Sequence, residues 1–241
     1  PGHNRMAPEV GGGMDPYPSG AFGNPSSRQR GGRKASAALE EARAVAAEAL
    51  GSQPREIFFT RGGTESDNLA LQGVAQSPVY KKRHIVTVAT EHRAVLDPCE
   101  VLETRGFRVT YLGVDSDGCL DLDRLTKAIT DQTLMVSVMH ANNEIGVLHP
   151  IADIGALCKD RGVLFHTDAT QSFGKEPIDV HAMGIDLLSA SAHKMHGPKG
   201  VGMLYVRRRD PRVRCAALLH GGGHERGLRS GTLNVPSIVG M

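Results

Sequence analysis

Short apolar runs alternate along this chain with longer stretches in which apolar residues recur every three or four positions. The short runs predict strands, and the periodic stretches predict helices. Seven strands are expected, at Glu56–Thr60, His84–Val88, Arg108–Leu112, Leu134–Val138, Val163–Thr167, Asp186–Ser189 and Gly200–Val206. Four helices are expected between them, at Thr64–Ala75, Ala94–Thr104, Asp121–Ile129 and Ile151–Lys159.

This alternation predicts an α/β fold, because parallel strands need a crossover connection, which is usually a helix. Several of the strands are continuously apolar, as is typical of a sheet that has both faces covered. We therefore expect a mainly parallel, mixed sheet of about seven strands with helices on both faces.

The first part of the chain follows a different pattern. Residues 1–26 are rich in glycine and proline and show no sustained period, which predicts an irregular N-terminal segment. From Gly32 onward, apolar residues recur at helical steps as far as Ala49, and Gly51 stands where a helix would end. We expect one large domain over residues 27–241.

Polar residues follow five of the predicted strands, at the point where each strand ends. Open parallel sheets bind their ligands at the carboxyl ends of the strands, so these residues are expected to share one rim. The five groups are Thr60–Ser66, Thr90–His92, His140–Glu144, Asp168–Gln171 and Ser191–Lys194.

Two of these groups carry chemistry that points to one cofactor. Lys194 follows an apolar strand and lies between His193 and a Gly-Pro turn, and a lysine there can be desolvated and become a nucleophile. Asp168 ends another apolar strand. A pyridoxal phosphate site needs an amine for a Schiff base and an anion for the pyridinium nitrogen. The alternatives are a surface lysine and an aspartate that caps a turn.

The remaining polar groups each have a functional and a purely structural interpretation. The segment Gly62-Gly63-Thr64 can hold a phosphate at a helix N-terminus, or it can be an ordinary turn with Thr64 as N-cap. His92 can move protons or stack on a ring, and Asn142 can offer an amide to a ring or substrate oxygen. Gln171 can reach a ring hydroxyl. All three residue types also occur in ordinary helices and turns.

Composition excludes several other classes of protein. The chain has 241 residues and a net charge of +2, and few aromatic residues lie near its basic clusters, so we expect no nucleic-acid partner. No apolar run approaches the roughly 20 residues that span a bilayer, and no signal peptide is visible, so we expect a cytoplasmic protein without membrane contact. The four cysteines form no CxxC pair, which argues against a metal site and favours a reducing compartment.

The ordered series of motifs resembles the cysteine desulfurases, a family within the class V aminotransferase-like pyridoxal enzymes. The resemblance runs from about residue 22 to the end of the chain. Its motifs include Phe22–Ser27, Phe59–Asn68, Thr90–His92, Asn142–Gly146, His166–Gln171, Ser191–Gly200 and Gly221–Thr232. The last of these resembles the branch of the family that serves iron–sulfur cluster assembly.

The resemblance implies a large domain of the pyridoxal-dependent transferase fold and a role for each candidate residue. The cofactor would be pyridoxal 5'-phosphate, bound to Lys194 as a Schiff base, with His92 over the ring and active in proton transfer. The reaction would turn L-cysteine into L-alanine and leave the sulfur on an enzyme cysteine as a persulfide. The other contacts implied are Asp168 with the pyridine nitrogen, Gln171 with the phenolic oxygen, Asn142 near the substrate carboxylate, Gly63, Thr64, Ser191 and His193 at the phosphate, and Thr232 at the phosphate of the second subunit of a homodimer.

Two departures from the family pattern stand out. An Ala-Thr-Thr segment near the family's N-terminus has no counterpart here, where His3-Asn4 leads directly into Arg5 and Met6. The small C-terminal domain, with a substrate-binding arginine and the mobile-loop cysteine that receives sulfur, is expected to be absent. The four cysteines present are expected to be ordinary buried or helical residues.

Three functions remain open from the sequence. The first is a cysteine desulfurase that would need an iron–sulfur scaffold or another sulfur acceptor as its partner. The second is a related pyridoxal enzyme, such as a selenocysteine lyase or an aminotransferase. The third is an inactive pairing or scaffold subunit, which would not hold the cofactor. Without the acceptor loop, we expect persulfide formation to be incomplete, and we expect an exposed apolar patch to lower solubility.

Overall fold

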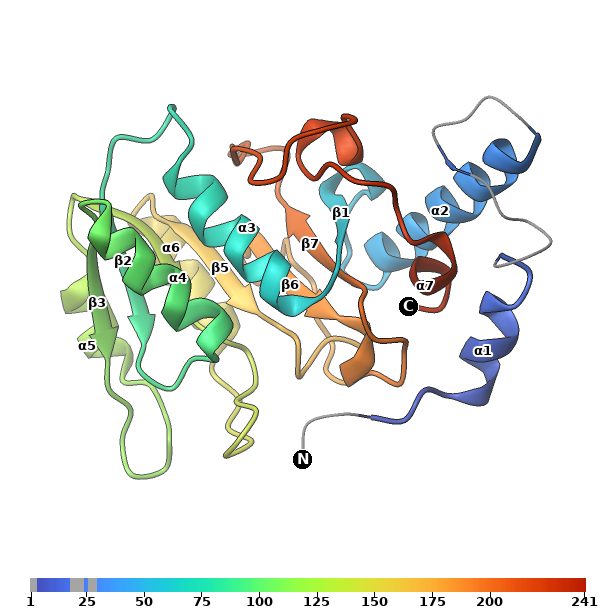
Figure 1. Cartoon of the computed structure of the whole chain (residues 1–241). Coiled ribbons are helices and arrows are strands. Elements are labelled where there is room, and N and C mark those ends of the chain that lie inside the picture. The colour runs from blue at the N-terminus through green and yellow to red at the C-terminus, as the bar shows by residue number, and fades with distance from the viewer. Residues whose placement is uncertain (1–3, 18–23, 26–29) are drawn as a thin grey trace.

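A single seven-stranded sheet forms the centre of the molecule, in a computed structural model that describes residues 4–17, 24–25 and 30–241 (Figure 1). The strand order is β1-β7-β6-β5-β4-β2-β3. The strands are β1 (Ile57–Thr60), β2 (His84–Val88), β3 (Arg108–Leu112), β4 (Thr133–Ser137), β5 (Leu164–Asp168), β6 (Leu187–Ser191) and β7 (Gly202–Val206).

The sheet is mixed, as expected. Strands β3, β2, β4, β5 and β6 pair in parallel, whereas β7 pairs antiparallel with both β6 and β1. All residues of the central strands are buried, which explains their continuous apolar runs. Strand β3 lies at an edge, and only its last residue, Leu112, is buried.

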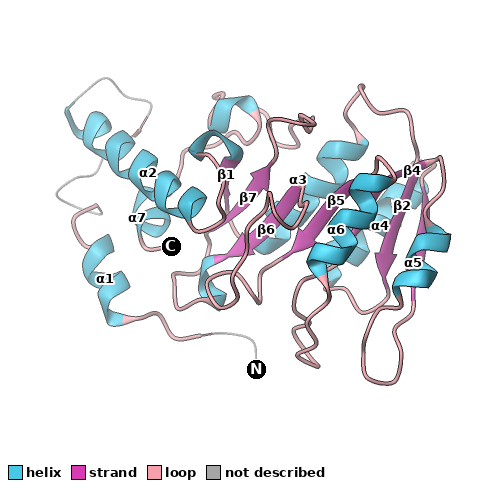
Figure 2. Cartoon of the chain, turned by 180° about the vertical axis from the view of Figure 1, so that it is seen from behind, coloured by secondary structure: helices cyan, strands magenta, loops and turns pink. Residues whose placement is uncertain are grey.

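Helices cover both faces of the sheet. On one face lie α3 (Gly63–Ala75) and α4 (Arg93–Thr104), which pack against β-strand residues such as Phe58 and Ile85 (Figure 1). On the other face lie α2 (Arg30–Glu48), α5 (Leu122–Ala128) and α6 (Ile151–Asp160), which pack against residues such as Phe165 (Figure 2). Each face therefore has its own apolar core.

The predicted strands and helices all form, with ends that differ by no more than a few residues. The exception is the N-terminal segment, which was expected to be irregular. Residues Pro8–Met14 form a short helix, α1, which begins with a proline at its first position and packs against α7 (Val235–Val239). Its three consecutive glycines disfavour a helix, so the sequence does not predict one there. Contact with α7 stabilises the helix in the folded chain. The parts of the predicted N-terminal segment and of the Phe22–Ser27 motif that fall on residues 1–3, 18–23 and 26–29 lie outside the described residues.

The topology brings the expected polar groups to one rim of the sheet. Strands β4, β5 and β6 are parallel, so Asp168 at the end of β5 and Ser191 at the end of β6 lie at the same edge. The short 3-10 helix η2 (Ala192–Lys194) continues directly from β6. Within the described part of the chain, no helix combines the length and apolar character that crossing a bilayer requires.

Candidate cofactor-binding site

The N-terminus of α3 forms an open cradle beside the end of β6. Its N-cap, Gly62, has a φ of 144°, which side chains other than hydrogen rarely permit. A Cβ atom on Gly63 would lie 2.8 Å from Thr170 Oγ1 and 3.7 Å from Ser191 Cβ. The first amides of a helix have no acceptor within it, so this glycine leaves backbone N–H groups accessible to an anion.

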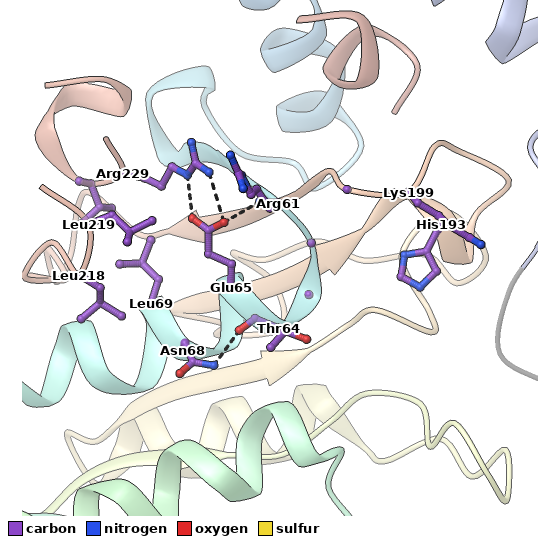
Figure 3. A pocket seen from close by; sticks show the side chains of 14 residues that line it. Arg61, Thr64, Glu65, Asn68, Leu69, His193, Lys199, Leu218, Leu219 and Arg229 are labelled. Atoms are coloured by element: carbon purple, nitrogen blue, oxygen red, sulfur yellow. Dashed lines mark hydrogen bonds and ion pairs between the residues drawn. The ribbon is translucent and has the colours of Figure 1, made fainter. Parts of the chain in front are cut away.

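Side chains from η2 and β6 complete the cradle. Ser191 is buried, and its hydroxyl group lies 2.9 Å from His193 Nδ1. His193 lines a cavity of about 610 Å³ together with Gly62, Gly63 and Thr64 (Figure 3). The sequence-predicted phosphate residues Gly63, Thr64, Ser191 and His193 are therefore together in space. A hydroxyl, an imidazole and a helix N-terminus are suitable donors for a phosphate group.

Lys194 and Asp168 lie close enough for their charges to affect each other. Burial and the positive charge of Lys175 lower the pKa of Lys194, while Asp168 raises it. Burial raises the pKa of Asp168. Hydrogen bonds from Thr170 and the positive charges of His92 and Lys194 oppose this rise. The amide of Thr170 donates to Asp168 Oδ1 at 2.8 Å. The expected amine and carboxylate therefore act on each other electrostatically.

His92 is exposed at the N-terminus of α4, where it is the N-cap residue. Its Nδ1 accepts a hydrogen bond from the Ala94 amide at 3.0 Å. This contact fixes the orientation of the imidazole, because the ring must keep Nδ1 toward the helix. The Nε2 atom then points away from the backbone amide and is the ring nitrogen suited to proton exchange.

Asn142 lies at the rim, but its amide is engaged in its own turn. Its Oδ1 accepts the backbone amides of Glu144 and Ile145 at 2.8 and 3.1 Å, and its Nδ2 donates to Thr90 O at 2.9 Å. The structure therefore favours the turn interpretation of this residue over direct contact through a free amide.

Gln171, three residues after Asp168, is half-buried at the start of the following turn.

Thr232 belongs to a segment late in the chain. It is exposed at the end of a glycine-rich loop (residues 221–232), in which five glycines have positive φ. The role implied for it, at the phosphate of a second subunit, stays a prediction.

Sequence reasoning missed two buried acids behind Asp168. Burial raises the pKa of both Asp67, on α3, and Glu91 well above the usual range, and the charge of Asp168 raises both further. Glu91 Oε1 accepts the Met139 amide, and Asp67 Oδ1 lies 3.6 Å from His166 Nε2. Burial therefore favours the neutral form of Asp67 and Glu91, while the positive charges of His92 and Lys194 favour the charged form of Asp168. The sequence signal was their position in the strand-end motifs.

The cysteines only partly match their expected placement. Cys99 and Cys158 are buried in α4 and α6, and burial raises the pKa of each to about 12. Cys215 is half-buried outside any helix. The expectation was wrong for Cys119, which is exposed in the loop between β3 and α5, because the local turn is held by Asp115 and not by core packing.

The residues present fit pyridoxal 5'-phosphate. The cradle that a Cβ on Gly63 would fill supplies donors for the phosphate, and Asp168 supplies an anion. Lys194 supplies an amine whose pKa is lowered by burial and by Lys175, which favours the uncharged nucleophile. These three features correspond to the phosphate, the pyridine nitrogen and the carbonyl carbon of the cofactor.

Comparison with known proteins agrees with this fit. The aminotransferase class-V family model matches residues 5–241. The chain is 57% identical to "Cysteine desulfurase IscS" of Proteus mirabilis over 223 residues, which is 92% of this chain and 55% of the relative. The structure named "SspA in complex with cysteine" superposes with a TM-score of 0.94 at 44% identity and covers 99% of this chain and 68% of that one. A "NIFS-LIKE PROTEIN" also gives a TM-score of 0.94, at 43% identity, with 99% and 65% covered.

The chain therefore spans about half the length of the curated relative that it matches. The similarity nevertheless extends through every strand of the sheet and every motif of the candidate site. The fold is confirmed as that of the pyridoxal-dependent transferases. This chain belongs to the aminotransferase class-V family, and within that family it is similar to the cysteine desulfurases.

Proposed function

We propose that this chain is the cofactor-binding part of a cysteine desulfurase. The enzyme would bind pyridoxal 5'-phosphate and convert L-cysteine into L-alanine, passing the sulfur to an enzyme cysteine as a persulfide. Its 57% identity to an IscS cysteine desulfurase supports this reaction, and so does its similarity to a protein solved in complex with cysteine. The name IscS also supports iron–sulfur cluster assembly as the destination of the sulfur.

One observation carries the proposal. A lysine and an aspartate that act on each other's pKa lie near the cradle at the N-terminus of α3, at the carboxyl ends of parallel strands. Purely structural roles for Lys194 and Asp168 do not require a cradle next to them. A pyridoxal site requires all three.

In the loaded enzyme, the phosphate would be held by Gly63, Thr64, Ser191 and His193. Asp168 would face the ring nitrogen, and Lys194 would bond to the carbonyl carbon. Gln171 would approach the phenolic oxygen, and Asn142 would orient the segment near the substrate. When bound, the cofactor supplies an electron sink for bonds next to the amino group of the substrate.

The residues of this chain would contribute proton and charge control. Lys194 supplies an uncharged Nζ, favoured by its partial burial and by Lys175. Asp168 would face the ring nitrogen, and the positive charges of His92 and Lys194 oppose the rise that burial gives its pKa. His92 keeps its Nδ1 on α4 and offers Nε2 for proton exchange with the substrate.

The active unit is proposed to be a homodimer in which Thr232 of one copy completes the phosphate site of the other. The exposure of Thr232 at the end of the glycine-rich loop supports this arrangement. A sulfur-acceptor protein or an iron–sulfur scaffold would be a further partner. The free cysteines are typical of a reducing compartment, which favours a cytoplasmic enzyme.

The test is to add pyridoxal phosphate to the purified chain and record its absorbance. A yellow band that borohydride removes is expected for the unaltered chain and for Lys159→Ala, a matched control at an exposed lysine on α6. The band is expected to be lost in Lys194→Ala. A colourless unaltered chain, or a band that survives in Lys194→Ala, would contradict the proposal and favour a scaffold subunit.

A further inference from the structure

A buried ion pair holds the glycine-rich loop to the body of the molecule. Arg43, on α2, donates from Nη1 to Glu225 Oε2 at 2.8 Å and from Nη2 to Glu225 Oε1 at 2.7 Å. The two side chains are only 3% and 1% exposed. Two parallel bonds between a guanidinium and a carboxylate fix the relative orientation of both groups.

The pair also joins a third element, the edge strand β1. Glu225 Oε2 accepts the backbone amide of Phe59 at 2.8 Å, and Arg43 Nη1 donates to Ile57 O at 2.8 Å. Burial alone would lower the pKa of Arg43, but its hydrogen bonds and charge interaction with Glu225 raise it above its ordinary value. The Arg43 guanidinium is therefore well satisfied by hydrogen bonds, in a place where an unpaired charge would be unfavourable.

The backbone of the loop is strained at this contact. Glu225 and Arg226 have φ values of 50° and 56°, in the left-handed region that residues other than glycine avoid. Such a conformation persists only where the surroundings enforce it. The bonds from Arg43 and Phe59 to the Glu225 carboxylate supply that enforcement.

A second ion pair holds the loop where it passes the cofactor cradle. Arg229 Nε donates to Glu65 Oε1 at 2.7 Å, and Glu65 lies in the first turn of α3 (Figure 3). Arg229 is buried, whereas Thr232, three residues later, is exposed. The loop is thus fixed to the protein on its inner side and presents Thr232 outward.

We propose that Arg43 and Glu225 are positioning residues that hold the glycine-rich loop in the conformation from which Thr232 reaches the phosphate of a cofactor in a second copy of the chain. This inference rests on the proposed function, because it needs a bound pyridoxal phosphate and a homodimer. Arg43 and Glu225 would act entirely through Thr232 and would not touch the cofactor.

The test is a double-mutant cycle that measures the dissociation constant of pyridoxal phosphate by absorbance titration of the apo chain. The variants are Glu225→Gln, Thr232→Ala and the combination of both. Glu225→Gln keeps the shape of the side chain and removes its charge. Arg43→Lys is a second route to the same disruption, because lysine keeps the charge and loses the two-pronged contact. Arg93→Ala removes an exposed arginine that pairs with Asp97 and serves as the control.

Glu225→Gln, Arg43→Lys and Thr232→Ala are each expected to weaken cofactor binding by about tenfold, the scale of one lost hydrogen bond to a charged group. The double variant Glu225→Gln/Thr232→Ala is expected to bind no more weakly than Thr232→Ala alone, because the ion pair acts through that threonine. Arg93→Ala is expected to bind as the unaltered chain does.

Additive losses in the double variant would overturn the inference, since the ion pair would then act on the cofactor by another route. Unchanged affinity in both Glu225→Gln and Arg43→Lys would also overturn it. If the two variants do not fold, hydrogen exchange of the unaltered chain decides: the hydrogen-bonded amides of Gly227 and Leu228 must be protected, and fast exchange there would overturn the inference. Failure of the proposed function looks different, since the unaltered chain would then form no yellow band at all.

Discussion

The side chain of Asn4 is hydrogen-bonded to the backbone of Lys194, with Nδ2 donating to the lysine carbonyl oxygen at 2.7 Å. The adjacent backbone strengthens the contact, because the Asn4 amide donates to His193 O at 3.3 Å and the Ala7 amide donates to His196 O at 2.9 Å. The segment that departs from the family pattern at the N-terminus therefore packs directly on the loop that carries the candidate lysine.

This contact predicts a role for Asn4 in ordering the lysine loop. Asn4→Ala removes a hydrogen bond and leaves the Lys194 carbonyl group without that donor, so we expect a loss of about 1 kcal/mol in local stability. Hydrogen exchange at residues 192–197 should become faster, and pyridoxal phosphate should bind more weakly. Thr104→Ala removes a similar bond to a backbone carbonyl on α4 and should change neither quantity. Equal exchange rates in Asn4→Ala and the unaltered chain would contradict the prediction.

Lys175 is expected to help keep Lys194 uncharged. Its positive charge is the second cause, after burial, of the lowered pKa of Lys194. Lys175→Gln should therefore raise the pKa of Lys194, so that attachment of pyridoxal phosphate reaches half its maximal rate at a higher pH. Lys175→Arg keeps the charge and should leave the pH profile unchanged, as should Lys159→Gln on α6. A profile that does not move in Lys175→Gln would show that burial alone controls the amine.

Much of this site was accessible from the sequence because its parts follow strands directly. The end of an apolar run locates Asp168 and Ser191 at the rim of a parallel sheet, and the parallel pairing of β5 with β6 brings them together. Lys194 follows Ser191 by three residues, so the same reasoning places it there.

The parts that escaped prediction depend on contacts between distant segments. Asn4 meets Lys194 across 190 positions in sequence, and Arg43 meets Glu225 across 182. Neither the periodicity of the sequence nor the local spacing of its residues predicts such a pair. The burial of Asp67 and Glu91, which raises their pKa values, was missed for the same reason. Whether a carboxyl group is buried depends on neighbours from other elements of the fold.

Gly63 offers a test of the phosphate cradle. An added Cβ in Gly63→Ala would lie 2.8 Å from Thr170 Oγ1, closer than such contacts normally permit, so the cradle should distort. We expect the affinity for pyridoxal phosphate to fall by about tenfold, equivalent to about 1.4 kcal/mol.

Removing the clash should restore binding. Thr170→Ala deletes the hydroxyl that meets the new Cβ, so Gly63→Ala/Thr170→Ala should bind the cofactor more tightly than Gly63→Ala. Gly12→Ala is the matched control, because nothing lies within 4 Å of a Cβ at that position. If Gly63→Ala bound the cofactor as tightly as the unaltered chain, the phosphate would have to lie elsewhere.

His166 is expected to make the protein sensitive to acid. It is fully buried on β5, and burial lowers its pKa from 6.5 to about 3. Its ring contacts Ser137 Oγ at 2.8 Å and Ser189 Oγ at 3.1 Å, so the neutral form is the one that the sheet accommodates. In the unfolded chain this imidazole takes up a proton near its ordinary pKa.

The unfolded state therefore binds more protons than the native state between about pH 6.5 and pH 3, so the contribution of His166 to stability falls as the pH falls through that window. The slope is about 1.4 kcal/mol for each pH unit. The raised pKa values of Asp67, Glu91 and Asp168 act in the opposite direction, since those groups bind protons in the native state.

A comparison with His166→Gln tests the contribution of the imidazole, because glutamine cannot take up the proton. Urea unfolding measured from pH 7 to pH 4 should show that the free energy of unfolding declines less steeply with falling pH in His166→Gln than in the unaltered chain. His181→Gln, which removes a histidine that is exposed, should keep the steeper decline. Parallel curves for the unaltered chain and His166→Gln would mean that the imidazole is already charged in the folded protein.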